Sequence, residues 1–267
     1  CRCGPSQKAE LVQKIKTYLG DNKRTLAIGD GGNDVSMILQ ADVGVGIEGK
    51  EGMQAALSSD FSIKKFCYLN NLLIWWGRVA YKNTAKMSLF VIYRGLIISL
   101  IQCIFSILFY FNSIALYNGM LILGYSTFYT TPPALSLLLD VDKNYYKKRK
   151  KYFPFLYKII SKGKELSIKN FIFWVNKSIF QAVLIVIGSI NYQQENVFLQ
   201  IVTITFSELI ITEVVTAYFQ IEKCNYLIAF GLLGTLGIYI FSVLTFKNIL
   251  DVSYVFEKET LKCIFVI

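Results

Sequence analysis

The chain has 267 residues, 54% of them hydrophobic, including 20 Phe and 17 Tyr, which is more than an ordinary soluble domain of this size carries. The 28 Lys and Arg residues outnumber the 18 Asp and Glu residues and give a net charge of +10. The absence of His excludes an imidazole base, a His-ligated zinc site and a His-containing catalytic triad from this stretch.

The first part of the chain alternates between helical and strand patterns. Apolar residues recur at helical spacing from Pro5 to Gly20, where the glycine is expected to end the helix. Three β-rich runs follow, separated by helix-like stretches: Thr25 to Ile28, Val43 to Ile47 and Phe61 to Ile63. This order predicts an α/β fold with a parallel sheet, in which residues 29–34 form the loop after the first strand.

After Gly77 the pattern changes to five apolar stretches, each close to the roughly 20 residues that span a bilayer. They are Met87 to Phe111, Tyr117 to Leu139, Phe171 to Ile190, Val197 to Phe219 and Tyr226 to Phe246. A sixth stretch begins near the last residue, and the first residue is Cys, so we expect a fragment of a longer protein.

The link between the second and third apolar stretches is strongly basic. Ten Lys and Arg residues stand there against Asp140, Asp142 and Glu165, so the positive-inside rule places residues 140–169 in the cytosol. The links at 112–116 and 191–196 contain no Lys or Arg and are expected on the other side. An even number of crossings returns the α/β part to the cytosol. The net charge is therefore interpreted as a sign of topology and not of nucleic-acid binding.

The six cysteines show no C-x-x-C spacing, and three of them lie in or beside apolar runs. They are predicted to be reduced and structural.

The loop Gly29-Asp30-Gly31-Gly32-Asn33-Asp34 lies where α/β sheets usually bind ligands. Its central glycines allow a ligand to approach closely, and a helix that begins at about Asn33 would favour a phosphate at its N-terminus. Asp30 and Asp34 supply the hard oxygen ligands that Mg²⁺ prefers. An ordinary Asp-Gly turn followed by a helix cap would explain the dipeptide alone, so both interpretations stay open on the loop by itself.

Longer strings around this loop resemble a known family. Gly29 to Ile38 resembles the last motif of the haloacid-dehalogenase-like phosphotransferases as it occurs in P-type ATPases. Cys1 to Lys8 resembles the segment of those enzymes that ends in a phosphoryl-neutralising Lys, with Gly4 where Ser is more usual. Three further strings, Gly46 to Ala56, Ser59 to Ile63 and Gly77 to Lys82, look like the type IV subclass, the phospholipid flippases.

The resemblance implies a partial haloacid-dehalogenase-like α/β phosphorylation domain at residues 1–85, followed by an α-helical transmembrane bundle at residues 86–267. The bundle would hold the fifth to ninth membrane helices and the start of the tenth. The implied activity is ATP-driven phospholipid translocation through an aspartyl-phosphate intermediate. The nucleophilic Asp of the family's Asp-Lys-Thr-Gly-Thr motif is missing, so the chain alone is expected to be inactive.

The resemblance also implies roles for named residues. Mg²⁺ would be held by Asp30 and Asp34, and ATP or phosphate would be contacted by Arg2. The catalytic residues would be Lys8, Asp30, Asn33 and Asp34, and of these Lys8, Asn33 and Asp34 would also contact the nucleotide. Without the resemblance, Lys8 is equally well a solvated lysine on an amphipathic helix.

The transported species is suggested by the first two membrane stretches. Ion-pumping relatives place carboxylates there, whereas Arg94 is the only charged side chain between Met87 and Leu139. The second stretch is rich in hydroxyl groups ahead of Pro132-Pro133, which free backbone carbonyls and kink a helix. This pattern favours a lipid headgroup. The predicted lipid path comprises Arg94, Ser126, Tyr129 and Thr130.

Alternative roles remain for the charged residues of the membrane stretches. Arg94 would also be explained by snorkelling or an interhelical bond, although a membrane-centre Arg costs about 2.5 to 3.5 kcal/mol on insertion scales and is usually functional. Glu208 and Glu213 are spaced five apart, do not share a helix face, and are expected to be structural partners first.

The implied partners are a phospholipid substrate and the membrane, with no nucleic acid. Residues 94–99, 124–125 and 129–130 look closest to the flippase branch that works without an accessory subunit. The implied location is a multi-pass membrane protein with a cytosolic N-terminal part, compatible with the Golgi and endosomes. The alternatives are a cation-transporting P-type ATPase and a channel or receptor-like membrane protein whose α/β part is regulatory.

Overall fold

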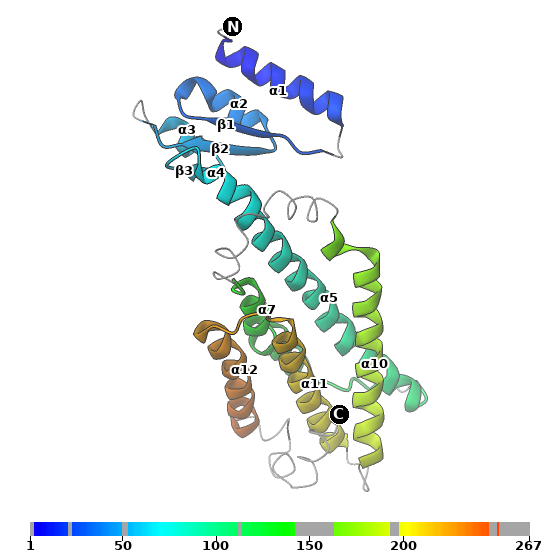
Figure 1. Ribbon diagram of the computed structural model, residues 1–267. Helices are drawn as coiled ribbons and strands as arrows, with labels where there is room; N and C mark the ends of the chain where they lie inside the picture. The colour runs from blue at the N-terminus through cyan, green and yellow to red at the C-terminus, as the bar shows by residue number, and fades with distance from the viewer. Residues whose placement is uncertain are drawn as a thin grey trace. The chain divides into compact units, whose positions relative to one another are not determined.

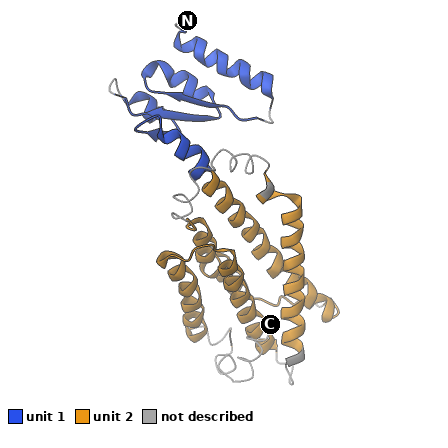
Figure 2. Ribbon diagram, in the orientation of Figure 1, with its two compact units in different colours: residues 1–77 blue, residues 78–267 orange. Residues whose placement is uncertain are grey.

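The computed structural model describes residues 3–20, 23–49, 53–111, 114–141, 163–192, 198–245 and 250 (Figure 1). The chain divides into two compact units, residues 1–77 and 78–267 (Figure 2). The predicted basic link lies mostly outside the described residues, as do Arg2 and the predicted sixth apolar stretch. Four described cysteines, Cys3, Cys67, Cys103 and Cys224, are free and exposed.

The first unit is built on a three-stranded parallel sheet. Its strands are β1 (Leu26–Gly29), β2 (Val43–Ile47) and β3 (Phe61–Ile63), in the order β1-β2-β3. The central strand is held on both sides, since Ala27 pairs with Gly44 and Val45 pairs with Phe61. Parallel neighbours joined by helical crossovers are the expected outcome of alternating strand and helix patterns. The predicted α/β fold is confirmed.

Helices α1 (Pro5–Leu19), α2 (Val35–Gln40) and α3 (Gln54–Ser58) accompany the sheet. Pro5 occupies the first turn of α1, where its missing N–H group costs nothing. Gly20 ends the helix with φ +66°, a conformation that disfavours side chains with a Cβ. The predicted helix from Pro5 to Gly20 is therefore confirmed.

The carboxylate of Asp42 ties α1 to the start of β1. It accepts hydrogen bonds from the Thr25 backbone N–H (2.8 Å) and hydroxyl (2.9 Å), and Lys16 lies 3.1 Å away. The Thr25 bonds, together with Lys16, lower the pKa of this carboxyl to about 2. Asp42 therefore remains ionised through most of the acid range.

The first apolar stretch follows the sheet as α4 (Tyr68–Asn70), the π-helix η2 (Asn71–Trp76) and α5 (Gly77–Leu108). The second apolar stretch is not one helix. It consists of α6 (Gly119–Gly124), the π-helix η3 (Tyr125–Tyr129) and α7 (Thr131–Leu138), whose first turn contains Pro132 and Pro133. Neither proline has an N–H group, so the regular backbone ladder cannot continue through this point. The predicted kink is confirmed, and it includes a widened turn that the sequence pattern did not indicate.

The remaining apolar stretches form α10 (Ile168–Tyr192), α11 (Phe198–Gln220) and α12 (Tyr226–Thr245), after a short 3-10 helix, η5 (Lys164–Leu166). Within the described residues, four helices are long and apolar enough to cross a membrane: the helix from Tyr68 to Leu108 and those beginning at Ile168, Phe198 and Tyr226. Helix α11 is the most deeply buried, with most of its side chains covered between Ile201 and Ala217. It is the centre of the second unit.

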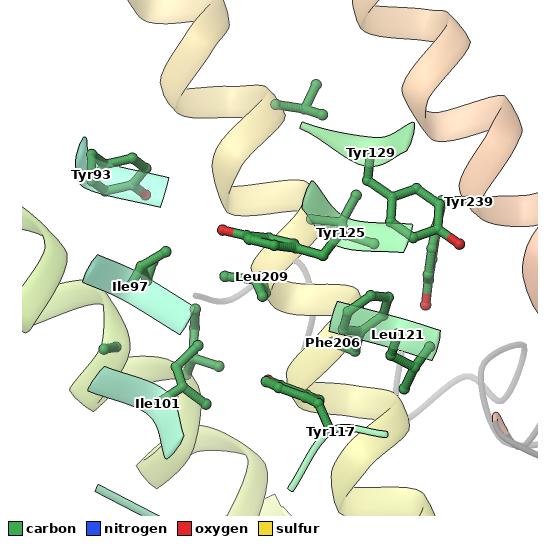
Figure 3. Close-up of a cluster of buried hydrophobic side chains, with 14 of the residues drawn as sticks. Tyr93, Ile97, Ile101, Tyr117, Leu121, Tyr125, Tyr129, Phe206, Leu209 and Tyr239 are labelled. Atoms are coloured by element: carbon green, nitrogen blue, oxygen red, sulfur yellow. The ribbon is translucent and has the colours of Figure 1, made fainter. Parts of the chain in front are cut away.

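Aromatic rings fill the space around α11 (Figure 3). Phe206 packs against Tyr117, Tyr129 and Tyr239, with ring centroids 5.5, 5.8 and 6.3 Å apart. The Tyr239 hydroxyl lies 2.5 Å from Ser207 Oγ on α11. Large rings with a satisfied hydroxyl suit a membrane core, because an unpaired polar group is costly there.

The buried carboxylate of Asp140, just after α7, connects the end of that helix to α5 and to the link between α11 and α12. It accepts hydrogen bonds from the backbone N–H groups of Glu222 (2.9 Å) and Lys223 (3.1 Å), in the link between α11 and α12. From α5, Lys86 Nζ lies 3.4 Å from the same carboxylate and 2.9 Å from the carbonyl oxygen of Gln220, which ends α11. A cation at a helix C-terminus complements the free carbonyls and the dipole there.

Candidate functional site

The glycine-rich loop lies at the carboxyl end of β1. Asp30 follows the strand directly and is exposed, and the 3-10 helix η1 (Gly32–Asp34) leads into α2. The turn needs a glycine at position 29, because a Cβ there would lie 2.3 Å from the Cβ of Asp34. The predicted strand–loop–helix arrangement is confirmed, with a short 3-10 turn before the α-helix.

Lys8 and Asp34 are brought together although 26 positions separate them. Lys8 Nζ lies 2.6 Å from Asp34 Oδ1, with side-chain exposures of 33% and 15%. The hydrogen bond to Asp34, followed by the attraction of its charge, raises the pKa of Lys8 above its usual value. The start of α1 therefore places the positively charged ammonium group of Lys8 beside the loop.

The other predicted residues of this site are placed differently. Asn33 is exposed on η1, and Asp30 is exposed at the end of the strand. Arg2 lies outside the described residues. The structure thus joins Lys8 to Asp34, while Asp30 and Asn33 face outward from the same loop.

The donor chemistry fits only one kind of metal site. Among the described residues, no three potential His, Cys, Asp or Glu ligands gather. Asp30 presents an exposed carboxylate, and one oxygen of Asp34 is engaged by Lys8. Mg²⁺ is commonly held by one or two carboxylates, with water and phosphate completing the shell. The residues fit a Mg²⁺ ion that also binds a phosphoryl group, and they do not fit an ion enclosed by protein.

Two contacts behind the loop were not predicted. A Cβ at Gly49 would lie 3.0 Å from the carbonyl oxygen of Asp30, and a Cβ at Gly32 would lie 2.2 Å from Gln54 Oε1. The glycine-rich segment after β2 and the start of α3 therefore pack tightly against the loop. The recurrence of glycine in both segments was the signal that they approach each other.

A second polar site lies within the helical unit. The Arg94 guanidinium on α5 is half-buried, and its Nη1 donates to Thr130 Oγ1. Thr130 Oγ1 donates in turn to the carbonyl oxygen of Tyr125 at 2.9 Å. Two of the four residues predicted for a lipid path are therefore in contact.

The other two predicted lipid-path residues lie elsewhere. Ser126 is exposed and donates to the carbonyl oxygen of Leu123 at 3.0 Å. Tyr129 is buried against Phe206 and Tyr239. Neither makes a hydrogen bond to Arg94 within the part of the chain that the structure describes.

Two residues of this polar site were not assigned to it from sequence. The Tyr125 hydroxyl contacts Arg94 O at 2.7 Å and also Glu213 Oε1 on α11. Glu213 was expected to be a structural partner, and its 2% exposure and bond to Tyr125 agree with that. No sequence signal pointed to Tyr125, because its bond joins it to a residue 31 positions away.

Comparison with known proteins identifies the family of the chain. Residues 56–265 match the model of the phospholipid-translocating P-type ATPase C-terminal region, and residues 5–55 match that of haloacid dehalogenase-like hydrolases. The chain is 43% identical over 255 residues to "Probable phospholipid-transporting ATPase IIB" of Bos taurus, covering 96% of the chain and 22% of that protein.

Two further relatives show the same partial coverage. The identity to "Phospholipid-transporting ATPase NEO1" of Saccharomyces cerevisiae is 53% over 181 residues, covering 68% of the chain and 15% of that protein. The identity to "Probable phospholipid-transporting ATPase tat-5" of Caenorhabditis elegans is 41% over 264 residues, covering 97% of the chain and 24% of that protein. The chain thus spans about a quarter or less of these relatives. With its four long apolar helices, the chain belongs to the phospholipid-translocating P-type ATPases, a family of integral membrane proteins.

Proposed function

We propose that the full-length protein containing this chain uses ATP to move a phospholipid across a membrane. The observation that carries this proposal is Arg94, the only charged side chain between Met87 and Leu139, which donates to a neutral hydroxyl. A guanidinium attracts the phosphate of a lipid headgroup and repels a cation. The names of the relatives, all phospholipid-transporting ATPases, support the same substrate class.

The loop after β1 is proposed as part of a phosphoryl-transfer site, and residues 1–85 as part of a phosphorylation domain. The chain holds no Asp-Lys-Thr-Gly-Thr sequence, so another part of the full-length protein would supply the nucleophilic aspartate. Mg²⁺, when bound, would stabilise the negative charge of the phosphoryl oxygens. Asp30 would hold this ion, and Asp34 would keep Lys8 in place to neutralise the phosphate. Asn33 would bind an oxygen of the phosphoryl group, and Arg2 would contact the nucleotide.

The topology follows from the charges of the links. We propose that residues 1–85 and the link at 140–169 face the cytosol, that residues 191–196 face the opposite side, and that the protein resides in the Golgi or endosomes. The resemblance of residues 94–99, 124–125 and 129–130 to the flippase branch that works without an accessory subunit supports a transporter of that kind.

Single-cysteine labelling tests this topology. In a cysteine-free version of the full-length protein, in sealed vesicles whose non-cytosolic face is turned outward, an impermeant maleimide should modify Gln194→Cys and spare Lys150→Cys until the membrane is permeabilised. The ten basic residues of the link are the physical reason, since cytosolic links retain Lys and Arg. Modification of Lys150→Cys with sparing of Gln194→Cys would contradict the proposed orientation.

Substitution of Arg94 tests the substrate class. Arg94→Ala in the full-length protein should leave phosphorylation by ATP intact and weaken the lipid's acceleration of phosphoenzyme decay by about tenfold or more, because a charge-assisted hydrogen bond is worth about 1.5 to 3 kcal/mol. The lipid response of Arg94→Lys should lie between those of the parent protein and Arg94→Ala, since the Lys ammonium is a point charge and lacks the planar guanidinium that binds phosphate with two hydrogen bonds.

The matched control for Arg94 is Arg24→Ala, which removes an exposed guanidinium from the first unit. This control should behave like the parent protein. If Arg94→Ala responded normally to lipid, and a cation were the required activator, the proposed substrate class would be wrong.

A further inference from the structure

The Arg94 side chain is part of a closed ring of hydrogen bonds between α5 and η3. Arg94 Nη1 donates to Thr130 Oγ1, and Thr130 Oγ1 donates to the carbonyl oxygen of Tyr125. The ring closes through the Tyr125 hydroxyl, which donates to the backbone carbonyl of Arg94 at 2.7 Å. The main chain and the side chain of Arg94 are therefore both fixed to the same widened turn.

The widened turn makes this ring possible. Thr130 N donates to the carbonyl oxygen of Tyr125 at 3.2 Å, a spacing of five residues. The same carbonyl thus accepts from both the amide and the hydroxyl of Thr130. π-turns inside helices are frequently found at functional sites.

Glu213 supports the ring from α11. Its carboxyl oxygen Oε1 contacts the Tyr125 hydroxyl, and its side chain is buried. Figure 3 shows the Tyr125 ring directed away from Tyr129 and Tyr239. The phenol has a single proton, for which the Arg94 carbonyl and Glu213 are both acceptors. The proton serves one of these acceptors at a time, and Glu213 therefore anchors, from α11, the phenol that meets the backbone of Arg94.

Glu213 attracts the charge of Arg94, but no direct ion pair neutralises it among the described residues. Among the described residues, no carboxylate lies within ion-pair distance of Arg94, and the guanidinium carries five N–H donors. Another cation within a membrane helix, Lys177 on α10, lies over the rings of Tyr93 and Trp174, with Nζ 5.6 and 5.4 Å from their centroids. Lys177 thus has a partner for its charge, whereas Arg94 donates to a neutral hydroxyl.

We propose that Tyr125 and Glu213 are positioning residues that hold the Arg94 guanidinium beside Thr130, unpaired and ready to bind the phosphodiester of a membrane lipid. The inference rests on the proposed function, because it assumes that the ligand of Arg94 is a transported phospholipid.

The test is phosphoenzyme decay measured against phospholipid concentration, in detergent, with the full-length protein. Tyr125→Phe removes only the hydroxyl and should raise the lipid concentration for half-maximal acceleration by about tenfold, the value of one hydrogen bond. The maximal decay rate and phosphorylation by ATP should stay close to those of the parent. Inorganic phosphate should not accelerate decay in any variant, because the ligand is a membrane lipid.

Glu213 is tested by two substitutions of similar size. Glu213→Leu removes the acceptor and should match Tyr125→Phe, while Glu213→Gln keeps an amide oxygen for the phenol and should restore most of the lipid affinity. The matched control is Tyr239→Phe, which removes a buried hydroxyl that bonds to Ser207 and should leave the lipid response unchanged.

A double substitution separates positioning from general packing. In an Arg94→Ala background, Tyr125→Phe should have no further effect on lipid affinity, since its role is exerted through Arg94. Additive losses, or equal losses in Tyr125→Phe and Tyr239→Phe, would overturn the inference. If Arg94→Ala itself left the lipid response unchanged, the proposed function would fail. If Arg94→Ala impaired the response and Tyr125→Phe did not, only the positioning role would fail.

Discussion

Asp30→Asn is expected to abolish ATP turnover in the full-length protein, with a loss of about a thousandfold or more, because the charge stabilisation supplied by a bound metal is worth several kcal/mol. Asp30 is the exposed carboxylate at the end of β1, and one oxygen of its neighbour Asp34 is engaged by Lys8. Asparagine keeps the size of the side chain and removes the negative charge that attracts Mg²⁺. The measurements are phosphoenzyme formation and steady-state ATPase rate.

The control for Asp30 is Glu10→Gln, which also removes one negative charge from the first unit. Glu10 is exposed on α1 and pairs only with Lys14, one helical turn away. Pairs of this type contribute little to stability, so this variant should retain full activity. An Asp30→Asn protein that is folded and hydrolyses ATP at a substantial rate would contradict the assignment of the loop.

The architecture of the first unit could be predicted because its signals are local. Val43 to Ile47 is strand β2 with the predicted bounds, and the predicted helix end at Gly20 coincides with the left-handed glycine after α1. Strands buried in a parallel sheet are short apolar runs, and glycine and proline mark their limits. Such patterns are complete within a few residues.

The candidate site was predictable only in part, because contacts between distant residues leave no local pattern. Asp30 and Asp34 stand out from the loop itself, whereas the 2.6 Å contact of Lys8 with Asp34 depends on how α1 packs beside α2. The tight approach of Gly49 to the Asp30 carbonyl depends in the same way on the sheet register.

The membrane region shows the same division. Hydropathy and the Pro132-Pro133 pair predicted the apolar stretches and the kink, but hydropathy does not tell which hydroxyl groups face one another. Tyr125 and Tyr129 lie on the same widened turn, yet only Tyr125 contacts the backbone of Arg94. The direction of a side chain in a π-turn departs from the 3.6-residue period on which sequence patterns rest.

The limit of prediction from sequence is clearest at Asp140. The sequence pattern placed this residue at the edge of a basic cytosolic link, whereas the structure buries it. The Asp140 side chain, just after α7, is 3% exposed. It contacts Lys86 of α5, and it accepts hydrogen bonds from two backbone N–H groups in the link before α12. Asp140→Ala is expected to destabilise the helical unit by about 3 kcal/mol, since it removes the buried partner of a charge pair and leaves Lys86 with only the exposed carboxylate of Glu222, 3.5 Å away.

Asp140→Asn should cost less than alanine, because the amide oxygen still accepts one of the two backbone N–H groups while its NH₂ group cannot replace the second acceptor. The control is Glu222→Gln, which weakens the ion pairs of Glu222 with Lys82 and Lys86 at a side chain that is 55% exposed and should cost less than about 1 kcal/mol. The measurement is the thermal unfolding midpoint of the purified protein in detergent. Because Lys86 and the two N–H groups lose their shared acceptor only in the Asp140 variants, equal midpoints for Asp140→Ala and Glu222→Gln would show that this carboxylate does not fasten the helix ends.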